Sequence, residues 1–235
     1  MTSTQQVLGW DAEGPNLKSK VIAIHAGGPL VGTGETFFIH ESYLTKSSEY
    51  FRAALRGPWQ EQQSRVINFA DEDAAVVKLY VQWAYTCKIY IRDECFEQGD
   101  PCTYRGDYER LVKAYAFGDK IQDVAFRDTL IDAIIALSKT PDAKDFCWLP
   151  IKDVVTTVYE STLPGSQLRQ LMVDFHAWMG AEDWVNEDIY GEFSADLIRA
   201  LWGRLKVKST NPLVTPACKY HDHAQLGEPC YKDGR

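Results

Sequence analysis

The sequence predicts an α+β fold, a small mixed sheet capped by helices, with an all-helical C-terminal extension. Two observations predict this fold. Short β-rich runs lie between residues 21 and 91, and apolar residues at helical spacing dominate the chain beyond them. The 45% hydrophobic and 25% charged residues of the 235-residue chain are typical of a globular protein.

Four short segments are predicted to be strands. The first two, Val21–His25 and Thr36–Ile39, flank a connection rich in Gly and Pro, which is typical of a hairpin. The third and fourth are Val66–Phe69 and Lys88–Ile91. The glycine-rich connection lacks the Lys that a phosphate-binding loop needs, so we interpret it as a turn.

Helices are predicted between and after these strands. Helical spacing begins at Ser42 and ends at Gly57-Pro58, and a second helix begins after the acidic residues 71–73. The acidic segment 92–104 is predicted to be a surface loop. Later helices are expected around residues 108–115, 126–135, 154–158, 168–178 and 193–205.

The composition argues against two classes of partner. With 33 acidic against 25 basic residues, the formal net charge is −8, which disfavours binding to the phosphate backbone of a nucleic acid. No window approaches 18 consecutive apolar residues, and the first residues lack the basic and apolar regions of a signal peptide. We therefore expect an intracellular protein, cytoplasmic or nuclear, with no membrane partner.

The six cysteines are expected to stay reduced in such a compartment. Cys87 and Cys147 have apolar neighbours in the sequence and are predicted to be small buried side chains. Cys95 and Cys102 flank an acidic stretch and could be exposed thiols. The other two cysteines lie among further potential metal ligands.

The C-terminal part of the chain combines two thiols and two imidazoles within thirteen positions. These four residues are Cys218, His221, His223 and Cys230. A tetrahedral structural zinc ion takes four ligands of these types, although the spacing is not that of a standard zinc finger. The alternative is a polar tail in which these residue types fall together by chance, or one that is held by Tyr220 and Tyr231.

The order and spacing of several residues resemble the BTB/POZ family. Residues 37–51 resemble its F-x-V-H-K-x-x-L-x-x-x-S-x-x-F signature, and residues 66–86 are similar to its strand–helix segment ending in Y-T-G, with Cys87 in place of Gly. Residues 111–121 resemble its L-x-x-L-Y-x-L-A-D-K-L helix. The set spans about residues 20–140, and the whole chain is similar to the compact BTB-plus-helices proteins common in filamentous fungi.

The resemblance divides the chain into four parts. They are a flexible lead-in at 1–19, the BTB/POZ domain at 20–140, a helical region at 141–208 and a polar Cys/His-containing tail at 209–235. His40 stands where the family keeps a histidine, and we expect it to make a structural hydrogen bond. The predicted core residues are Leu44, Phe51, Leu79, Trp83 and Tyr85.

The resemblance implies function by contact. BTB domains dimerise or recruit other proteins, and the family has no catalytic residues to carry over. The sequence itself shows no nucleophile with a nearby base, so we expect a non-enzymatic scaffold that self-associates or recruits partners. Family dimers pair near the first strand and the first helix, which makes Tyr43 and Tyr50 candidate interface residues. A structural zinc ion is the one cofactor that we consider.

The alternative function is that of a substrate adaptor for a cullin-based ubiquitin ligase. Cullin adaptors of the family usually place a hydrophobic-x-Glu motif after the helix that contains the counterpart of Phe51. The counterpart by position is Ala54-Leu55-Arg56, which puts Arg where Glu is expected, and Trp59-Gln60-Glu61 lies five residues later. Because a reversed charge opposes binding to the same partner surface, cullin binding is disfavoured.

Overall fold

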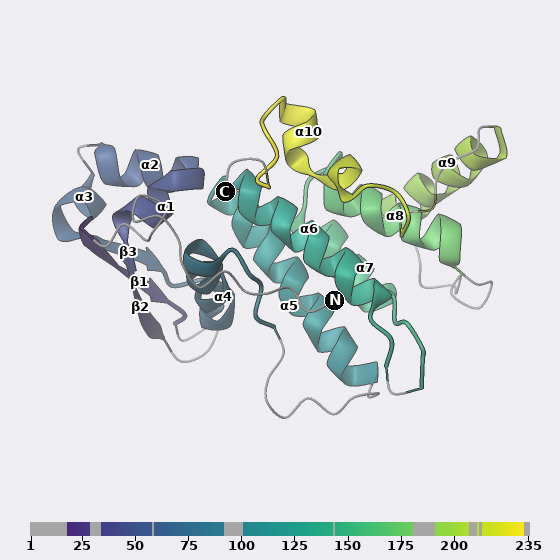
Figure 1. Ribbon diagram of the computed structural model, residues 1–235, viewed down its shortest axis with the longest axis horizontal. Coiled ribbons are helices and arrows are strands. Elements are labelled where there is room, and N and C mark those ends of the chain that lie inside the picture. The colour runs from purple at the N-terminus through teal and green to yellow at the C-terminus, as the bar shows by residue number, and fades with distance from the viewer. Residues whose placement is uncertain are drawn as a thin grey trace, which may run out of the picture.

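The structure is a computed structural model, in which a small sheet with its helices lies at one end and the later helices extend away from it (Figure 1). The described residues are 18–28, 34–57, 59–91, 101–142, 144–180, 191–206, 211 and 213–232. No helix within these ranges is both long enough and apolar enough to cross a membrane.

The sheet has three strands, β1 (Val21–Ala26), β2 (Glu35–His40) and β3 (Val66–Phe69), in the order β2-β1-β3. Strand β1 pairs antiparallel with β2 and parallel with β3, which confirms the mixed sheet and the predicted hairpin. Alternate residues of β1, including Ile22 and Ile24, are fully buried, as expected for a sheet with one face against the core.

The prediction of a fourth strand at 88–91 is wrong. These residues follow helix α4 (Ala74–Thr86) and have no strand assignment. Ile89 and Ile91 are partly buried against the core, and the Ile91 carbonyl accepts a hydrogen bond from the Arg110 guanidinium at 2.5 Å. The alternation of apolar residues correctly indicated packing on one side, but a strand also needs a neighbouring strand, which a local pattern cannot show.

The helical segment predicted from Ser42 to Gly57 is divided into α1 (Glu41–Ser47) and α2 (Glu49–Arg56). Ser48 separates them because its extended backbone caps α2. Its hydroxyl accepts the Phe51 N–H at 3.2 Å and donates to the Ile121 carbonyl at 2.5 Å. The break therefore joins the first helices to the chain that precedes α6.

The later predicted helices are confirmed, with different bounds. The remaining elements are α3 (Gln60–Ser64), α5 (Pro101–Lys120), α6 (Val124–Lys139), α7 (Lys152–Ser161), α8 (Gln167–Met179), α9 (Glu192–Lys206), the 3-10 helix η3 (Ala217–Tyr220) and α10 (Asp222–Leu226). Helix α5 begins at Pro101, so the loop predicted at 92–104 extends too far. Proline suits the first turn of a helix, and here it begins one.

Four of the five predicted core residues are buried, namely Leu44, Phe51, Leu79 and Trp83. Tyr85 is a correction, because 37% of it is exposed. It lies near the end of α4, where its hydroxyl accepts the His40 backbone N–H at 3.0 Å and lies 2.8 Å from His40 Nδ1. The polar end of the ring thus stays at the surface, where it holds the end of β2.

A fully buried carboxylate, Asp123, connects three parts of the fold. Its Oδ1 accepts the Phe126 N–H at 3.0 Å and so caps α6. Its Oδ2 accepts the Ser47 hydroxyl at 2.6 Å and the Tyr80 hydroxyl at 3.0 Å, from α1 and α4. Helix α6 is therefore fixed to the sheet end of the molecule by hydrogen bonds as well as by packing.

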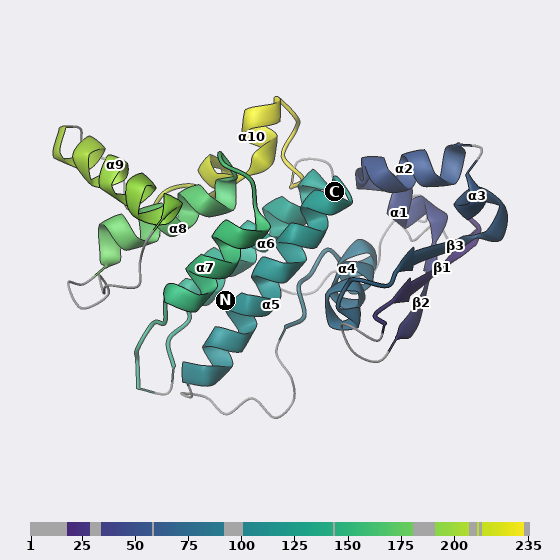
Figure 2. The same ribbon diagram turned by 180° about the vertical axis from the view of Figure 1, so that it is seen from behind.

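The C-terminal segment is a packed part of the structure and not a loose tail. Helices η3 and α10 lie on α6, and η3 also contacts α8, as both views show (Figures 1 and 2). Tyr220 is fully buried, and its hydroxyl donates to Asp174 of α8 at 3.0 Å. This contact agrees with the expectation that Tyr220 holds the segment.

Candidate functional site

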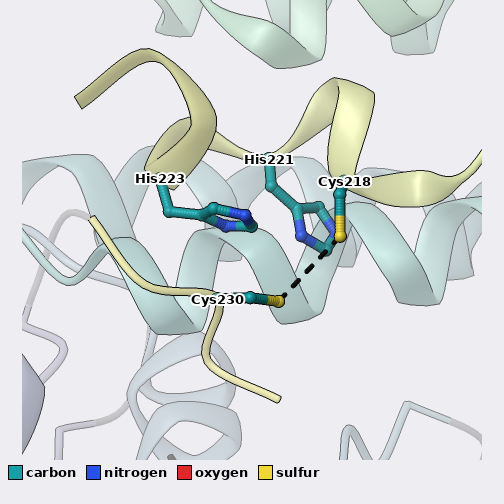
Figure 3. A group of neighbouring side chains, drawn as sticks. All are labelled: Cys218, His221, His223 and Cys230. Carbon is teal, nitrogen blue, oxygen red and sulfur yellow. Dashed lines mark hydrogen bonds between the residues drawn. The ribbon is translucent and has the colours of Figure 1, made fainter. Parts of the chain in front are cut away.

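The four residues predicted to bind zinc lie together. They are Cys218, His221, His223 and Cys230, and one ligand atom from each lies within 4.8 Å of the other three. Figure 3 shows the four side chains converging on one small space beside α6. Gly227 makes this possible, because its φ of 70° ends α10 and returns the chain so that Cys230 reaches the other ligands.

The two sulfur atoms are separated by the distance expected of two ligands on one metal ion. Cys218 Sγ lies 4.0 Å from Cys230 Sγ, about twice the ~2.05 Å bond of a disulfide. Two thiolates at about 2.3 Å from a tetrahedral zinc ion would lie roughly 3.8 Å apart. The observed separation is close to the one that shared coordination would require.

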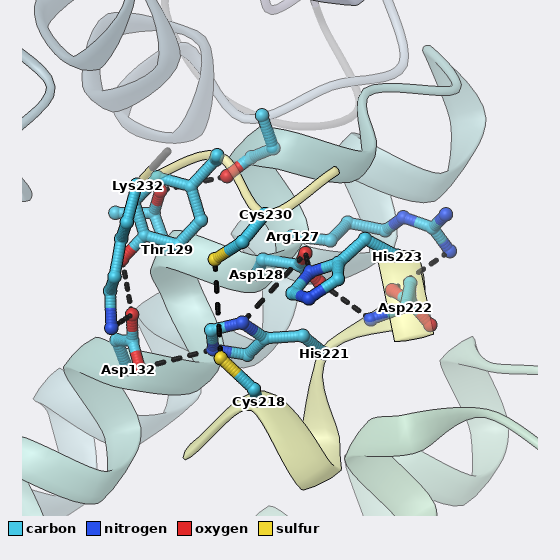
Figure 4. Close-up of polar contacts among 12 residues, drawn as sticks. Arg127, Asp128, Thr129, Asp132, Cys218, His221, Asp222, His223, Cys230 and Lys232 are labelled. Carbon is cyan, nitrogen blue, oxygen red and sulfur yellow. Dashed lines mark hydrogen bonds and ion pairs between the residues drawn. The ribbon is translucent and has the colours of Figure 1, made fainter. Parts of the chain in front are cut away.

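Each imidazole is oriented by a carboxylate of α6 (Figure 4). His223 Nδ1 lies 2.5 Å from Asp128 Oδ2, and His221 Nε2 lies 3.1 Å from Asp132 Oδ1. These two hydrogen bonds do not use the second ring nitrogen of either histidine, which is Nε2 in His223 and Nδ1 in His221. The latter atom is buried and has no hydrogen-bond partner among the described residues. Metal-binding histidines are usually held in this way by a carboxylate on the second nitrogen.

Asp132 is held in its ionised form by the C-terminal segment. Burial alone would raise its pKa, but hydrogen bonds from His221, Lys232 and Tyr231 outweigh burial and lower the pKa to about 2. Lys232 Nζ lies 2.8 Å from the carboxylate, and the Tyr231 hydroxyl donates to the same oxygen. This hydrogen bond to Asp132 agrees with the expectation that Tyr231 holds the C-terminal segment.

The cluster has a buried side and an exposed side. His221 is fully buried and His223 nearly so, whereas Cys218 is exposed and Cys230 partly buried. Burial and the neighbouring Cys230 raise the pKa of the Cys218 thiol. A metal ion could therefore enter from the thiol side and would then be enclosed by four protein ligands, which is the arrangement of a structural site.

Sequence reasoning missed the two carboxylates that orient the imidazoles. Asp128 and Asp132 are four positions apart within a segment predicted to be helical, so their common face was readable. Their partners lie about 90 residues later in the chain. No local spacing could connect the two.

A second candidate site is the solvent-facing side of the sheet. In the register of the strands, Phe38 lies beside Ala23 and Ala23 beside Val66, which makes an apolar row across all three strands. Phe38 is 65% exposed, and Val21 on the same side is 47% exposed. We call these four residues the sheet face. Contiguous exposed apolar surface is a candidate site for contact with another protein.

The predicted interface residues Tyr43 and Tyr50 lie elsewhere. Both are partly buried and pack against the core, with the Tyr43 ring 4.5 Å from the Tyr85 ring and the Tyr50 ring 5.3 Å from the Phe51 ring. Burial raises the pKa of Tyr50. Their contact with a partner stays a prediction.

The exposed Phe38 was overlooked, although the sequence carries a signal for it. Phe37 and Phe38 are adjacent in a predicted strand, and successive side chains of a strand point to opposite faces. Phe37 packs against the core, so Phe38 must face outward.

Two of the three histidines outside the cluster, His40 and His176, make contacts of a structural kind. His40 makes its expected hydrogen bond, to the Tyr85 hydroxyl. His176 Nδ1 lies 2.9 Å from the Met172 carbonyl, its ring packs edge-on against Phe193, and burial lowers its pKa. Neither histidine contacts the metal-ligand cluster.

Two predictions about cysteines are wrong. Cys87 and Cys147 are exposed rather than buried. Cys87 ends α4 with a φ of 57°, at the position where the Y-T-G signature has Gly, and this capping position faces solvent. Cys95 and the side chain of Cys102 lie outside the described residues.

Comparison with known families decides what the sheet end of the molecule is. A family model described as the BTB/POZ domain matches residues 30–98. The chain contains a BTB/POZ domain. BTB/POZ domains generally mediate protein–protein interactions and are generally not enzymes. No curated protein sequence matches the chain.

The two candidate sites lie differently with respect to the BTB/POZ domain. Phe38 and Val66 of the sheet face lie within the residues that match, which in turn lie inside the predicted range 20–140. The Cys/His cluster lies far beyond the match, although α6 brings it against the same body of helices. The cluster is therefore a property of this chain beyond its BTB/POZ match.

The BTB/POZ domain carries the expected departure from the cullin-binding pattern. Ala54 and Leu55 are buried in α2, and Arg56 is exposed at its end. An outside partner would meet the Arg56 guanidinium there and not an apolar side chain. Trp59 is exposed nearby, just before α3.

Proposed function

We propose that this chain is a non-enzymatic interaction module that pairs with a second copy of itself through the sheet face. The observation that carries the proposal is the apolar row formed by Phe38, Ala23 and Val66 across the sheet. Fully burying a Phe side chain contributes roughly 1.5–3 kcal/mol. Covering the exposed 65% of Phe38 would therefore contribute about 1–2 kcal/mol per copy.

A second copy suits this surface because a two-fold contact places the same patch on both sides. Such a contact fails when it brings like charges together. The outward positions of the three strands carry no Asp, Glu, Lys or Arg. They are Val21, Ala23, His25, Thr36, Phe38, His40, Val66 and Asn68. Two copies can therefore meet over this face without charge repulsion.

A different surface supports recruitment of another protein. Ile198, Leu201 and Trp202 are exposed on α9, and their spacing places them on one side of the helix. Trp202 is 62% exposed. An apolar helix face of this kind fits a groove on a partner. We propose it as the recruiting surface, separate from the self-association surface.

The test of self-association is the molar mass of the purified full chain, measured by light scattering over a range of concentrations. We expect wild type to be dimeric and Phe38→Thr to dissociate at concentrations about 30- to 1,000-fold higher, since two copies each lose roughly 1–2 kcal/mol. Threonine keeps the β propensity of the position. Leu163→Thr, at an exposed site between α7 and α8, is the matched control.

Three outcomes would contradict the proposal. Wild type could be a monomer throughout, or Phe38→Thr and Leu163→Thr could behave alike. In the third outcome, Trp202→Gln dissociates the dimer and Phe38→Thr does not, which would assign self-association to α9. Circular dichroism of each variant separates loss of pairing from loss of fold.

Cullin adaptor function remains the alternative. Arg56 opposes it, because the family's cullin-binding members place Glu there. The chain and a cullin, each purified, should elute separately in size-exclusion chromatography. Co-elution of the wild-type chain with the cullin would replace the scaffold proposal with the adaptor function.

A further inference from the structure

We propose that Cys218, His221, His223 and Cys230 bind one zinc ion in a closed structural site, and that Asp128 and Asp132 of α6 orient its two imidazoles. This inference does not depend on the proposed self-association, since none of these residues belongs to the sheet face. The donor set is two thiols and two imidazoles, which is a common ligand set of structural zinc.

The positions of the ligand atoms fit one ion. All four lie within 4.8 Å of one another, and the two sulfur atoms are 4.0 Å apart. Tetrahedral coordination at the usual Zn–S and Zn–N lengths needs separations of roughly 3.3–3.8 Å. Small movements of the side chains would therefore close the site. No rearrangement of the backbone is required.

The hydrogen bonds of the imidazoles supply an independent argument. Asp132 accepts from His221 Nε2, which leaves the lone pair of Nδ1 for a ligand bond. That nitrogen is buried and lacks a hydrogen-bond partner among the described residues, since Asp128 Oδ2 lies 4.0 Å away, beyond hydrogen-bond distance. A buried polar atom without a partner destabilises the fold, so the structure is more stable when a metal ion occupies this position.

A carboxylate also orients the His223 ring, but through Nδ1, whereas the His221 ring is held through Nε2. Asp128 Oδ2 is bonded to Nδ1 at 2.5 Å, so Nε2 is the atom that can bind the metal. The other oxygen of Asp128 accepts the Asp222 backbone N–H at 2.6 Å, which fixes the carboxylate itself. The two imidazoles thus have defined tautomers, one for each ring.

The short helices η3 and α10 would be stabilised by a crosslink between them. Helix η3 has four residues and α10 has five, and helices of this length are not stable by themselves in water. A zinc ion would join η3, α10 and the turn that carries Cys230 into one unit. With four protein ligands no position stays open for water or substrate, so the role is structural and not catalytic.

The choice of zinc follows from the ligands. Thiolate and imidazole disfavour Mg²⁺ and Ca²⁺, which prefer oxygen, whereas a mixed sulfur and nitrogen tetrahedron is typical of zinc. A Rieske-type 2Fe–2S cluster also takes two Cys and two His, but it divides them between two iron ions, whereas here all four ligand atoms lie within 4.8 Å of one another, as one ion requires.

The first test measures metal in the tag-free full chain, purified without chelator, by inductively coupled plasma mass spectrometry. We expect about one zinc ion per chain in wild type and in the control Cys147→Ser, whose thiol is also exposed but lies outside the cluster. Cys218→Ser should lower the zinc affinity by more than about 100-fold, beyond the ~10–100-fold expected for a residue that only orients a ligand.

A second measurement covers the case in which Cys218→Ser does not fold. Wild type is stripped of metal and titrated with Co²⁺, which should give the visible absorption of tetrahedral cobalt with thiolate ligands and lose it when Zn²⁺ is added. Folded wild type without zinc and without this spectrum would overturn the proposal. So would a Cys218–Cys230 disulfide in the metal-free protein as isolated, seen as a mass lower by two hydrogens.

Discussion

The Asp128→Asn substitution tests the proposed zinc site through a residue that does not itself bind the metal. Asparagine has the same shape as aspartate, so no cavity forms. The Asp128 carboxylate accepts two hydrogen bonds, from His223 Nδ1 at 2.5 Å and from the Asp222 N–H at 2.6 Å. An amide has one accepting oxygen and one donating NH₂ group. Either orientation of the Asn side chain therefore places a donor against a donor.

The more stable orientation keeps the bond to the backbone of Asp222 and turns the NH₂ group toward His223. The imidazole must then carry its proton on Nε2, which is the atom required for zinc. We expect zinc affinity to fall by about 10–100-fold, the usual effect of losing an orienting carboxylate. This factor corresponds to roughly 1.4–2.8 kcal/mol. A lost hydrogen bond to a charged group contributes a similar amount, about 1.5–3 kcal/mol.

The assay is competition for zinc between the full chain and a chromophoric chelator at fixed pH. The matched control is Asp174→Asn, which weakens the contact of the same C-terminal segment through Tyr220 and Lys219 without touching an imidazole. We expect a change of less than about 3-fold for the control, since it alters a contact outside the metal's ligands. Equal losses for both variants, or none for Asp128→Asn, would refute the argument from tautomers.

Three further predictions concern stability. Asp123→Ala should lower the free energy of unfolding by roughly 2–5 kcal/mol, because it removes the cap of α6 together with the carboxylate that accepts the Ser47 and Tyr80 hydroxyls. Asp73→Ala, which removes only the cap of α4, should cost about 0.5–2 kcal/mol. Urea denaturation measures both, and equal losses would contradict the buried-network argument. Burial lowers the pKa of His176 in the folded chain, so the unfolded chain takes up this proton at a higher pH than the folded chain does. The free energy of unfolding should therefore fall as the pH drops through the ordinary pKa near 6.5. His176→Gln should reduce this acid-dependent slope, by at most about 1.4 kcal/mol per pH unit, and an unchanged slope would refute the assignment. Cys87→Gly should change stability by between 0 and about 1 kcal/mol in the favourable direction, and Cys87→Val should destabilise by more than about 1 kcal/mol, because φ is 57°. Thermal denaturation should place Cys87→Gly at or above wild type in stability and Cys87→Val below it. The reverse order would contradict the argument from φ.

Local patterns predicted most of the secondary structure. Helical spacing predicted α4 and α6 to α9, and α4 and α6 to α8 each have a buried stripe that packs on the core, whereas α9 buries Phe193 and leaves Ile198 and Leu201 exposed. The same reasoning failed at 88–91, where alternate burial arises from packing on helices and not from pairing with a strand. It also missed the break at Ser48, because the contacts that stabilise that cap come from residues 121 and 123. The missing information was non-local in both cases.

The candidate metal ligands could be found from the sequence because all four lie within thirteen positions. Their surroundings could not, because Asp128 and Asp132 come from a helix some 90 residues earlier. The exposed Phe38 is the opposite case, because strand alternation already requires one of two adjacent phenylalanines to face outward. The strand pattern thus indicated that Phe38 is exposed, whereas the carboxylates that contact the two imidazoles could be identified only from the folded structure.

Helix α6 connects the two candidate sites without making them one site. Its first residues are tied to α1 and α4 through Asp123, and its next turns carry Asp128 and Asp132 beneath the Cys/His cluster. The sheet lies at one end of the molecule, and the C-terminal segment lies over the middle helices (Figures 1 and 2). Because the buried Asp123 contacts do not involve the metal ligands, removing zinc should loosen residues 217–232 and leave the sheet face intact. Hydrogen exchange with and without a chelator would show this as faster exchange in that segment alone, at an unchanged dimer dissociation constant. A chelator that also dissociated the dimer would instead show that the cluster supports self-association through α6.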